Sequence, residues 1–357
     1  MRIIQMLPVL AFGDAIGNDT VTLKNTLKNA GYDTEIYAQV IDGRLPVGTA
    51  KQVDEYSVQN EDIIIYHLST GSELNYQFER YECRKVIMYH NITPPDFFQP
   101  YQQEAAQNCR DGLTAADFLS DKVEFCFADS AFNKQDLIHM GYECPIDVLP
   151  ILIAFKDFEK KPNAAVIRKY GSDDYVNIVF TGRIAPNKKH EDLIAAFYYY
   201  KIYINPKSRL FLVGNYGVND RYYQKLAKYV EKLGLEDVYF TGHIKFDEIL
   251  AYYSVADIFL CLSEHEGFCV PLVEAMYFNV PIIAYDSCAV GETLGGAGLL
   301  LPEKDSKVVA EAIHMVVKKQ KLRETMIKNG KERLQYFEHD RIEKQFLDVM
   351  RQMIKGE

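Results

Sequence analysis

The stretch "DIFLCLSEHEGFCVPLVEAMYFNVPIIAY", residues 257–285, contains a complete strand, turn, helix and second strand. The apolar run "DIFLCLS" ends at the acidic loop "EHEG". Pro271 then suits the first turn of a helix, where its missing N–H would be unpaired anyway. The second run, "VPIIAY", follows that helix. Runs without polar alternation are typical of strands that a parallel sheet buries on both faces, so this stretch predicts one strand–helix–strand unit.

The same alternation extends through the chain. From residue 176 it reads "VNIVFTGR", "HEDLIAAFYYYKI", "SRLFLVGN" and "DRYYQKLAKYVEKLGL", and the first half opens with "RIIQMLPVLAF" and "NDTVTLKNTLKNAGY". This order predicts two Rossmann-like, doubly wound α/β domains facing a central cleft, with ligands at the carboxyl ends of the strands. We expect the domains at residues 1–153 and 176–339, with the polar stretch 154–175 as a linker.

Length and composition favour a globular protein of two domains. The chain has 357 residues, 48% hydrophobic and 25% charged, and no apolar run approaches the roughly 18 residues of a membrane helix. The N-terminus lacks a basic segment and an Ala-x-Ala cleavage site, so we interpret it as a buried strand and not as a signal peptide. None of the seven cysteines forms a Cys-x-x-Cys pair, which argues against a structural zinc site and favours a reducing cytoplasm.

The charge is unevenly distributed between the two halves. Residues 1–155 contain 11 Lys and Arg against 22 Asp and Glu, a net charge of −11, whereas the remainder carries +1. An acidic first half argues against nucleic acid as a partner and against broad docking of that half on an anionic membrane.

Two carboxylates flank the opening turn. Glu266 lies in the loop, and Glu274 is expected in the first turn of the following helix, so both should converge on one ligand. A carboxylate repels phosphate, and these acids therefore suit the vicinal hydroxyls of a sugar or ribose, while the N–H groups of Gly267 and Phe268 open toward an anion. The alternative is that Glu274 only complements the helix dipole and Glu266 caps the helix.

A second turn, "FTGRIAPNKKHEDLI", also joins a strand to a helix. Its Arg183 and Lys188 suit a diphosphate, because a fixed guanidinium and a mobile ammonium can share the charge. Lys189 is a substitute for Lys188 or a solvated neighbour. The alternative interpretation is an ordinary basic loop.

Signals in the first half are weaker. "GDAIGND" places Gly13 and Gly17 where a backbone can approach closely, although it is no nucleotide fingerprint. His90, in "VIMYHNITPPDFF", either donates to a sugar hydroxyl or is a satisfied structural histidine. "EHE", residues 264–266, is the metal candidate worth naming, but no Asp-x-Asp accompanies it, and we expect no metal. No Gly-x-Ser-x-Gly elbow supports a serine nucleophile.

Together these motifs resemble the retaining GT-B glycosyltransferases of family four, the glycosyl transferases group 1, of the type found in bacterial clusters for capsule or lipopolysaccharide. The family's pattern of an acid, seven residues and a second acid is present from Glu266 to Glu274, and "TGRIAPNKKHEDLI" is similar to its Gly-Arg…Lys phosphate loop. "YFTGHI" and "GETLGGAGLLLPEKD" match flanking blocks. The resemblance covers most of residues 176–335, and the first half matches more loosely through "GDAIGND", "YHNITPP" and "ADSAFNKQDL".

The resemblance implies a role for each matched residue. Arg183 and Lys188 would hold the donor diphosphate, Glu274 the ribose hydroxyls and Glu266 the transferred sugar. The remaining donor contacts, to sugar, phosphate and base, would come from His90, Gly17, Gly267, Phe268, Cys269, Thr241, Gly242 and Ile244. Of the whole set, Glu266, Arg183, Lys188 and His90 would act in catalysis. The family often has glycine where Cys269 and Lys189 stand, and the helix at residues 340–357 would cross back onto the first domain.

The function implied is retaining transfer of a hexose or deoxyhexose from a nucleotide diphosphate sugar to a hydroxyl of a glycan or lipid-linked acceptor. Neither metal nor cofactor is expected, residues 1–153 would choose the acceptor, and the base (UDP, GDP or dTDP) stays open. A cytoplasmic protein is expected, with peripheral association at the inner face of the membrane left open. The alternatives are a GT-B sugar-nucleotide epimerase, or a non-catalytic nucleotide-sugar-binding subunit. A phosphorylase would need a lysine for pyridoxal phosphate, for which the sequence offers no context.

Overall fold

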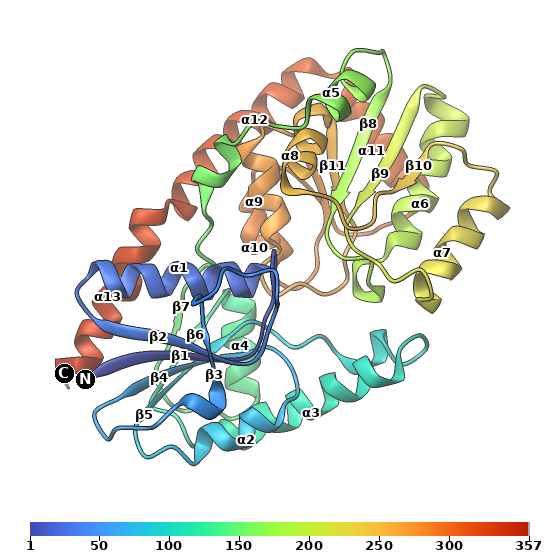
Figure 1. Cartoon of the computed structure of the whole chain (residues 1–357). Coiled ribbons are helices and arrows are strands. Elements are labelled where there is room, and N and C mark those ends of the chain that lie inside the picture. The colour runs from blue at the N-terminus through green and yellow to red at the C-terminus, as the bar shows by residue number, and fades with distance from the viewer. Residues whose placement is uncertain (356–357) are drawn as a thin grey trace. The chain divides into compact units, whose positions relative to one another are not determined.

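A computed structural model describes residues 1–355, which form two compact units (Figure 1). Unit 1 comprises residues 1–99, residues 103–154 and the chain from residue 337. Unit 2 comprises residues 100–102 and 155–336. Each unit is a parallel sheet with helices, so the predicted pair of doubly wound α/β domains is confirmed. No helix within residues 1–355 is both long and apolar enough for a membrane span.

Unit 1 is built on a seven-stranded parallel sheet in the order β3-β2-β1-β4-β5-β6-β7. The runs "RIIQMLPVL" and "IIIYHL" form its two central strands, which pair from Ile3 with Ile63 onward. Its strands are β1 (Arg2–Leu10), β2 (Asp33–Ile41), β3 (Lys51–Gln52), β4 (Ile63–Leu68), β5 (Arg84–Tyr89), β6 (Phe125–Ala128) and β7 (Ile146–Val148). Its helices are α1 (Ala15–Asn29), α2 (Glu73–Glu79), α3 (Gln103–Leu119), α4 (Ala131–His139) and α13 (His339–Lys355).

The amphipathic helix expected from residue 340 runs as α13 and packs in unit 1. Its Ile342 and Phe346 are buried in one apolar cluster with Leu23 and Leu27 of α1, and Figure 1 shows the two helices close together. The apolar stripe of α13 therefore completes a core that the first 154 residues leave uncovered on that side of the sheet. Residues 356–357, included in the predicted helix, lie outside the described residues.

Unit 2 repeats the design with six parallel strands in the order β10-β9-β8-β11-β12-β13. The strands are β8 (Val176–Thr181), β9 (Ser208–Val213), β10 (Val238–Phe240), β11 (Ile258–Cys261), β12 (Ile282–Tyr285) and β13 (Leu299–Leu301). The helices are α5 (Ala164–Tyr170), α6 (His190–Tyr199), α7 (Arg221–Lys232), α8 (Phe246–Val255), α9 (Val270–Tyr277), α10 (Val290–Leu294), α11 (Ser306–Lys318) and α12 (Gln320–Leu334). The strand order reverses between β8 and β11, the place where open α/β sheets bind ligands.

The structure differs from the prediction over residues 154–175, which were expected to be a linker. Residues 155–175 belong to unit 2, and α5 lies within them, capped by the Asn163 side chain, which accepts hydrogen bonds from two N–H groups of the first turn. The Tyr170 ring packs against Phe211, with 4.8 Å between centroids. A helix of seven residues is too short for its apolar face to stand out in a polar stretch, which explains the error.

Two turns of unit 2 begin their helices with a left-handed residue that is not glycine. Lys189, before α6, has φ of 52°, and Cys269, before α9, has φ of 72°. An L-residue in this conformation costs roughly 1–2 kcal/mol relative to the right-handed one. The turn geometry is thus the one glycine favours, although this chain places side chains there.

Candidate functional site

The candidate site of unit 2 is formed by the turns that follow β8 and β11, two adjacent strands. Lys188 ends the short 3-10 helix η4 (Pro186–Lys188), and its Nζ donates to Oε2 of Glu266 in the β11–α9 turn at 2.5 Å. The turns are also joined through Asn187, whose carbonyl accepts from the Glu264 N–H at 2.9 Å and whose side chain donates to the His265 carbonyl at 3.0 Å. Long-range contacts therefore fix the predicted basic and acidic turns together.

The Lys188–Glu266 pair is largely shielded from water. The Glu266 side chain is 7% exposed and that of Lys188 is 22% exposed. Burial alone would lower the pKa of Lys188, but the charge of Glu266 outweighs it and leaves that pKa raised above its usual value. The ammonium is therefore held in its charged form beside a carboxylate that an incoming anion could replace.

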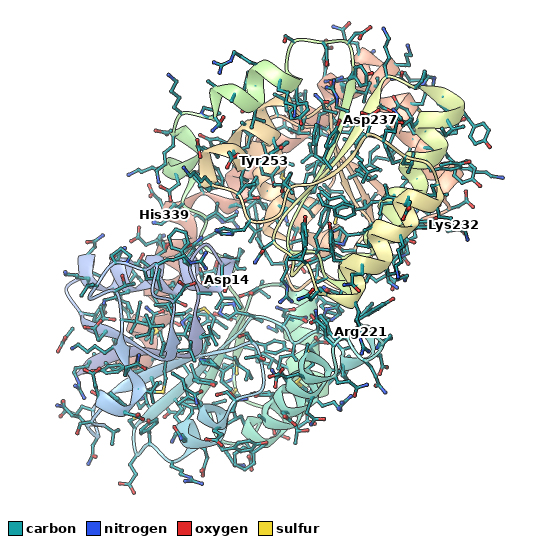
Figure 2. All side chains as sticks on the ribbon, turned by 45° about the vertical axis from the view of Figure 1, so that its right-hand side comes forward. Asp14, Arg221, Lys232, Asp237, Tyr253 and His339 are labelled. Atoms are coloured by element: carbon teal, nitrogen blue, oxygen red, sulfur yellow. The ribbon has the colours of Figure 1, made fainter. Side chains whose placement is uncertain are left out.

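Glu274 lies further along its helix than predicted, and its partner within the chain is Tyr253. Because α9 begins at Val270, Glu274 lies in its second turn, not its first. Its Oε2 accepts from the Tyr253 hydroxyl at 2.6 Å, and that hydroxyl also bonds Thr181 Oγ1 at the end of β8. Burial raises the pKa of Glu274, opposed by the Tyr253 bond. Tyr253 lies on α8 within unit 2 (Figure 2), so a buried hydroxyl positions the acid, and the reading that Glu274 complements the helix dipole is not supported.

Arg183 and Lys189 differ in what they contact. Arg183 is exposed, and among residues 1–355 no ion pair of its side chain is found. Lys189 Nζ instead pairs with Oε2 of Glu264 at 2.9 Å, and Glu264 also pairs with Lys304. Arg183 is therefore available to an anionic ligand, whereas Lys189 is engaged by an acid that the predicted site does not include.

Packing explains the shape of the turn that carries Arg183. Gly182 has φ of 143°, and a Cβ on Gly214 would lie 1.9 Å from the Gly182 carbonyl oxygen. The Gly214 N–H donates to Thr241 Oγ1 at 3.3 Å, which brings the loop after β10 to the same place. Three strand ends thus meet around a backbone contact that only glycine at position 214 permits.

The residues predicted to line a base pocket lie in this loop after β10. The Thr241 hydroxyl donates to the Gly242 carbonyl at 3.2 Å. Gly242 has φ of 69° and faces the ring of Tyr216, 3.7 Å from where its Cβ would be. Ile244 packs partly against the apolar cluster around Tyr170 and Phe211. A left-handed glycine beside a tyrosine ring therefore shapes this loop.

The turn before α9 is fixed at both ends. The Phe268 carbonyl accepts from the Thr293 hydroxyl at 2.5 Å, and the Glu266 carbonyl accepts from the Ala289 N–H at 3.3 Å. Phe268 and Cys269 are buried, and Gly267 is partly exposed. The turn that carries Glu266 thus leads into the amino end of α9, where the helix dipole favours negative charge.

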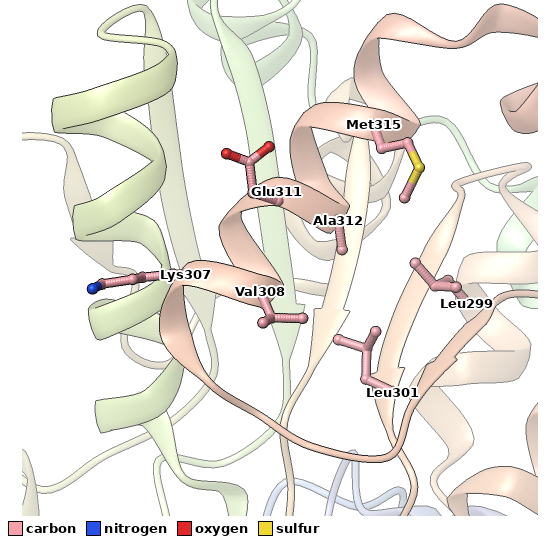
Figure 3. Close-up of a pocket in the computed structure, with 7 residues that line it drawn as sticks. All are labelled: Leu299, Leu301, Lys307, Val308, Glu311, Ala312 and Met315. Carbon is pink, nitrogen blue, oxygen red and sulfur yellow. The ribbon is translucent and has the colours of Figure 1, made fainter.

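An apolar pocket of 400 Å³ elsewhere on unit 2 is separate from this site (Figure 3). It lies between β13 and α11, and none of the residues predicted to bind a ligand lines it. Its lining residues are Leu299, Leu301, Lys307, Val308, Glu311, Ala312 and Met315.

In unit 1, His90 belongs to a buried chain of hydrogen bonds. Its Nδ1 lies 2.9 Å from Oδ2 of Asp129, and its Nε2 lies 2.8 Å from Nδ1 of His67. Nε2 of His67 lies 2.9 Å from Oε1 of Gln5, whose amide donates to the Thr20 carbonyl. Both ring nitrogens of His90 are thus satisfied within unit 1, as in the structural alternative, and its contact with a sugar stays a prediction.

The charges of the residues around His90 shift one another's pKa values. Burial would lower the pKa of His90, but the neighbouring carboxylates, Asp129 first, leave that pKa raised. Asp19 accepts from the Leu152 N–H at 2.8 Å, and burial raises the pKa of Asp19 to about 7. Sequence reasoning missed Asp129, His67 and Asp19, because buried polar partners from the turn after β6, from β4 and from α1 leave no local pattern.

Gly17 is explained by contacts of the chain itself. It lies in the first turn of α1, and a Cβ there would come within 2.7 Å of the Ala11 carbonyl oxygen. The close approach of this helix to the end of β1 therefore requires glycine, whether or not a phosphate also binds there.

Two clusters in residues 1–355 bring three potential metal-binding groups within 4.8 Å of one another. One consists of Asp19, His67 and His90, and the other of Cys261, Glu266 and Cys269. Of the "EHE" motif, Glu266 belongs to the second cluster, whereas Glu264 pairs with two lysines.

A protein-family model described as glycosyl transferases group 1 matches residues 164–333. An uncharacterized glycosyltransferase of Methanocaldococcus jannaschii is 30% identical over 165 residues, which are 46% of this chain and 44% of that protein. The O-antigen chain mannosyltransferase B of Escherichia coli is 23% identical, over 54% of this chain and 51% of that protein. The chain thus spans about half the length of these curated relatives.

Solved structures are similar over nearly the whole chain. Sucrose-phosphate synthase from Thermosynechococcus elongatus gives a TM-score of 0.80 at 19% identity, covering 100% of both chains. Anabaena HepE in complex with UDP-glucose gives 0.77 at 17% identity, covering 98% of this chain and 99% of that one. The lipopolysaccharide glycosyltransferase WaaG gives 0.72 at 15% identity, covering 97% of this chain and 99% of that one. At such low identity the likeness shows the fold alone, and it confirms the predicted GT-B class.

Proposed function

We propose that this chain transfers a sugar from a nucleoside diphosphate sugar bound on unit 2, because a model of the glycosyl transferases group 1 family matches residues 164–333. The observation that carries the proposal is the shielded Lys188–Glu266 pair at 2.5 Å. It joins a charge suited to phosphate to one suited to sugar hydroxyls. Arg183 is exposed nearby in sequence, and Tyr253 holds the second acid, Glu274.

Donor binding would separate the ion pair. The diphosphate takes the Lys188 ammonium and the Arg183 guanidinium, and the released Glu266 carboxylate accepts a hydrogen bond from a hydroxyl of the sugar. Glu274, held by Tyr253, accepts from the ribose hydroxyls. The loop with Thr241 and Gly242 would recognise the base mainly through backbone groups.

Catalysis would follow from stabilising the leaving group. As the bond from the anomeric carbon to phosphate breaks, negative charge grows on the diphosphate. Lys188, Arg183 and the amino end of α9 stabilise that charge, so the reaction requires no metal ion. The acceptor hydroxyl attacks from the face that the phosphate leaves, which retains the anomeric configuration, and the leaving phosphate takes the proton.

The acceptor is proposed to be a hydroxyl of a glycan or a lipid-linked glycan, chosen by unit 1, and the transferred sugar a hexose or deoxyhexose. The relatives support this class: they include a mannosyltransferase for O-antigen chains and a capsular polysaccharide glycosyltransferase of Staphylococcus aureus. A cytoplasmic location, with peripheral contact to the inner face of the membrane, fits such acceptors.

The test is a thermal-shift screen of UDP-, GDP- and dTDP-sugars, followed by assay of donor turnover with and without glycan acceptors. A ligand at 100 times its Kd stabilises a protein by about 2.7 kcal/mol, so the true donor should stand out. Slow donor hydrolysis without acceptor would exclude a purely binding subunit, and the absence of a free epimer would exclude an epimerase. Failure of every nucleotide sugar to stabilise the chain or to be consumed would overturn the proposal.

A further inference from the structure

Two thiols adjoin Glu266 without a part in the proposed transfer. Cys261 ends β11, and Cys269 precedes α9 across the turn that carries Glu266. The two sulfur atoms lie 4.0 Å apart, and each lies within 4.8 Å of a carboxylate oxygen of Glu266. All three residues are buried, at 0%, 6% and 7% exposure for Cys261, Cys269 and Glu266.

The spacing of the sulfur atoms fits a shared metal ion better than a disulfide. Two thiolates bound tetrahedrally to Zn²⁺ at about 2.3 Å place their sulfur atoms roughly 3.8 Å apart. A disulfide would need roughly 2.05 Å, about half the observed separation. The pair therefore needs almost no movement to bind an ion and considerable movement to oxidise.

The Glu266 carboxylate of the cluster already binds one cationic group. Lys188 Nζ lies 2.5 Å from Oε2 of Glu266, so a positive charge already occupies one side of the cluster. A divalent ion bound to both sulfur atoms and to Glu266 would weaken or replace that contact. Because the Lys188 side chain is 22% exposed, the ion would enter the cluster from the side of Lys188.

We propose that Cys261, Cys269 and Glu266 form a binding site for a thiophilic divalent cation such as Zn²⁺, and that its occupancy inhibits the use of donor. Each bound thiol loses its proton as the ion binds, so two protons leave per ion. Inhibition follows because the ion holds Glu266 and repels the Lys188 ammonium. The inhibitory part rests on the proposed function, whereas binding of the ion does not.

The chain contains a matched control for this site. Cys126 and Cys144 of unit 1 place their sulfur atoms 3.6 Å apart, but no carboxylate or imidazole completes a metal-binding cluster around them among residues 1–355. If spacing of thiols were sufficient for binding, both pairs would take the ion. The proposal requires the third group, Glu266.

The experiment uses the full chain, reduced with a phosphine and freed of metal by a chelator that is then removed. Titration with Co²⁺ should give the thiolate charge-transfer absorption of one bound ion per chain, and Zn²⁺ should abolish it by displacement. Cys261→Ser and Cys269→Ser should each weaken Zn²⁺ binding by more than about 100-fold, since even outer partners of metal ligands contribute about 10–100-fold. Zn²⁺ binding should be weakened likewise in Cys261→Ala and in Glu266→Gln, which are included in case a buried serine hinders folding.

The double variant Cys126→Ser/Cys144→Ser should bind Zn²⁺ as tightly as the wild type does. Zn²⁺ should lower donor turnover of the wild type, and chelator should restore it, while turnover without added metal is unaffected by chelator. An absent thiolate absorption, or its loss in the Cys126/Cys144 variant instead, would overturn the proposed site. Clear absorption in a chain that consumes no nucleotide sugar would leave the site standing and refute the proposed function alone.

Discussion

The ion-paired turns of unit 2 and the histidine chain of unit 1 are both polar clusters in parallel sheets, but they are satisfied differently. Both ring nitrogens of His90 have partners within unit 1, Asp129 on one side and His67 on the other. In unit 2 the main contact joins Lys188 to Glu266, two opposite charges that a ligand with phosphate and hydroxyl groups can satisfy separately. The first cluster is closed and suits stability, whereas the second can exchange partners and suits binding.

The largest effect should come from removing a partner of His90 in the cluster of unit 1. Asp129→Ala removes the partner of His90 Nδ1 and should destabilise unit 1 by about 3–5 kcal/mol, the typical cost of leaving one member of a buried ionic pair unpaired. Urea unfolding, followed by probes in each unit, measures it. Asp129→Asn keeps an acceptor for the histidine and should lose less. Equal, small losses in both variants would show that the His90 chain does not stabilise unit 1.

The next largest effect should come from removing the ammonium of the Lys188–Glu266 ion pair. Lys188→Ala should lower donor turnover by about 10²–10³-fold, as the loss of a group that stabilises charge in the transition state does. Lys189→Ala is the matched control, because its ammonium pairs with Glu264. The comparison fails if the two variants lose turnover equally.

A smaller effect should follow from neutralising the second acid. Glu274→Gln should weaken binding of free nucleoside diphosphate by about 1.5–3 kcal/mol, the contribution of a hydrogen bond to a charged group. Calorimetric titration measures it. Glu266→Gln should reduce turnover more than nucleotide affinity, because its proposed partner is the sugar. Wild-type affinity in Glu274→Gln would contradict the assignment to ribose.

The smallest expected effect concerns the turn before α6. Lys189 has φ of 52°, so Lys189→Gly should be more stable than Lys189→Ala, by up to roughly 1–2 kcal/mol. Both variants lose the ion pair with Glu264, so the difference isolates the backbone. Thermal unfolding of the two variants checks it, and a more stable alanine variant would show that the left-handed turn is not strained.

Sequence reasoning identified the two domains and the turns of unit 2, because strand ends, Pro271 and the spacing of Glu266 and Glu274 are local signals. It did not identify the side chains that bind the site residues from other elements. Tyr253 reaches Glu274 from 21 residues away, and Glu264 reaches Lys304 from 40 residues away. Such contacts arise from how helices pack on the sheet, and a single sequence carries no period that reveals them.

The same reasoning explains the other differences. A helix start one residue earlier than expected, at Val270, moved Glu274 into the second turn. The seven-residue helix α5 was hidden in a polar stretch. The bonds of His90 depend on Asp129, 39 residues away, so the two interpretations of that histidine were indistinguishable before the fold was known.

Amide hydrogen exchange on the full chain, with and without the nucleoside diphosphate selected by the screen, tests the central claim most directly. The account predicts protection of the turns at residues 182–189 and 264–270, and of the loop at residues 241–244, with little of it left in Lys188→Ala at the same ligand concentration. Strong protection confined to unit 1, or protection of unit 2 that Lys188→Ala fully retains, would contradict it.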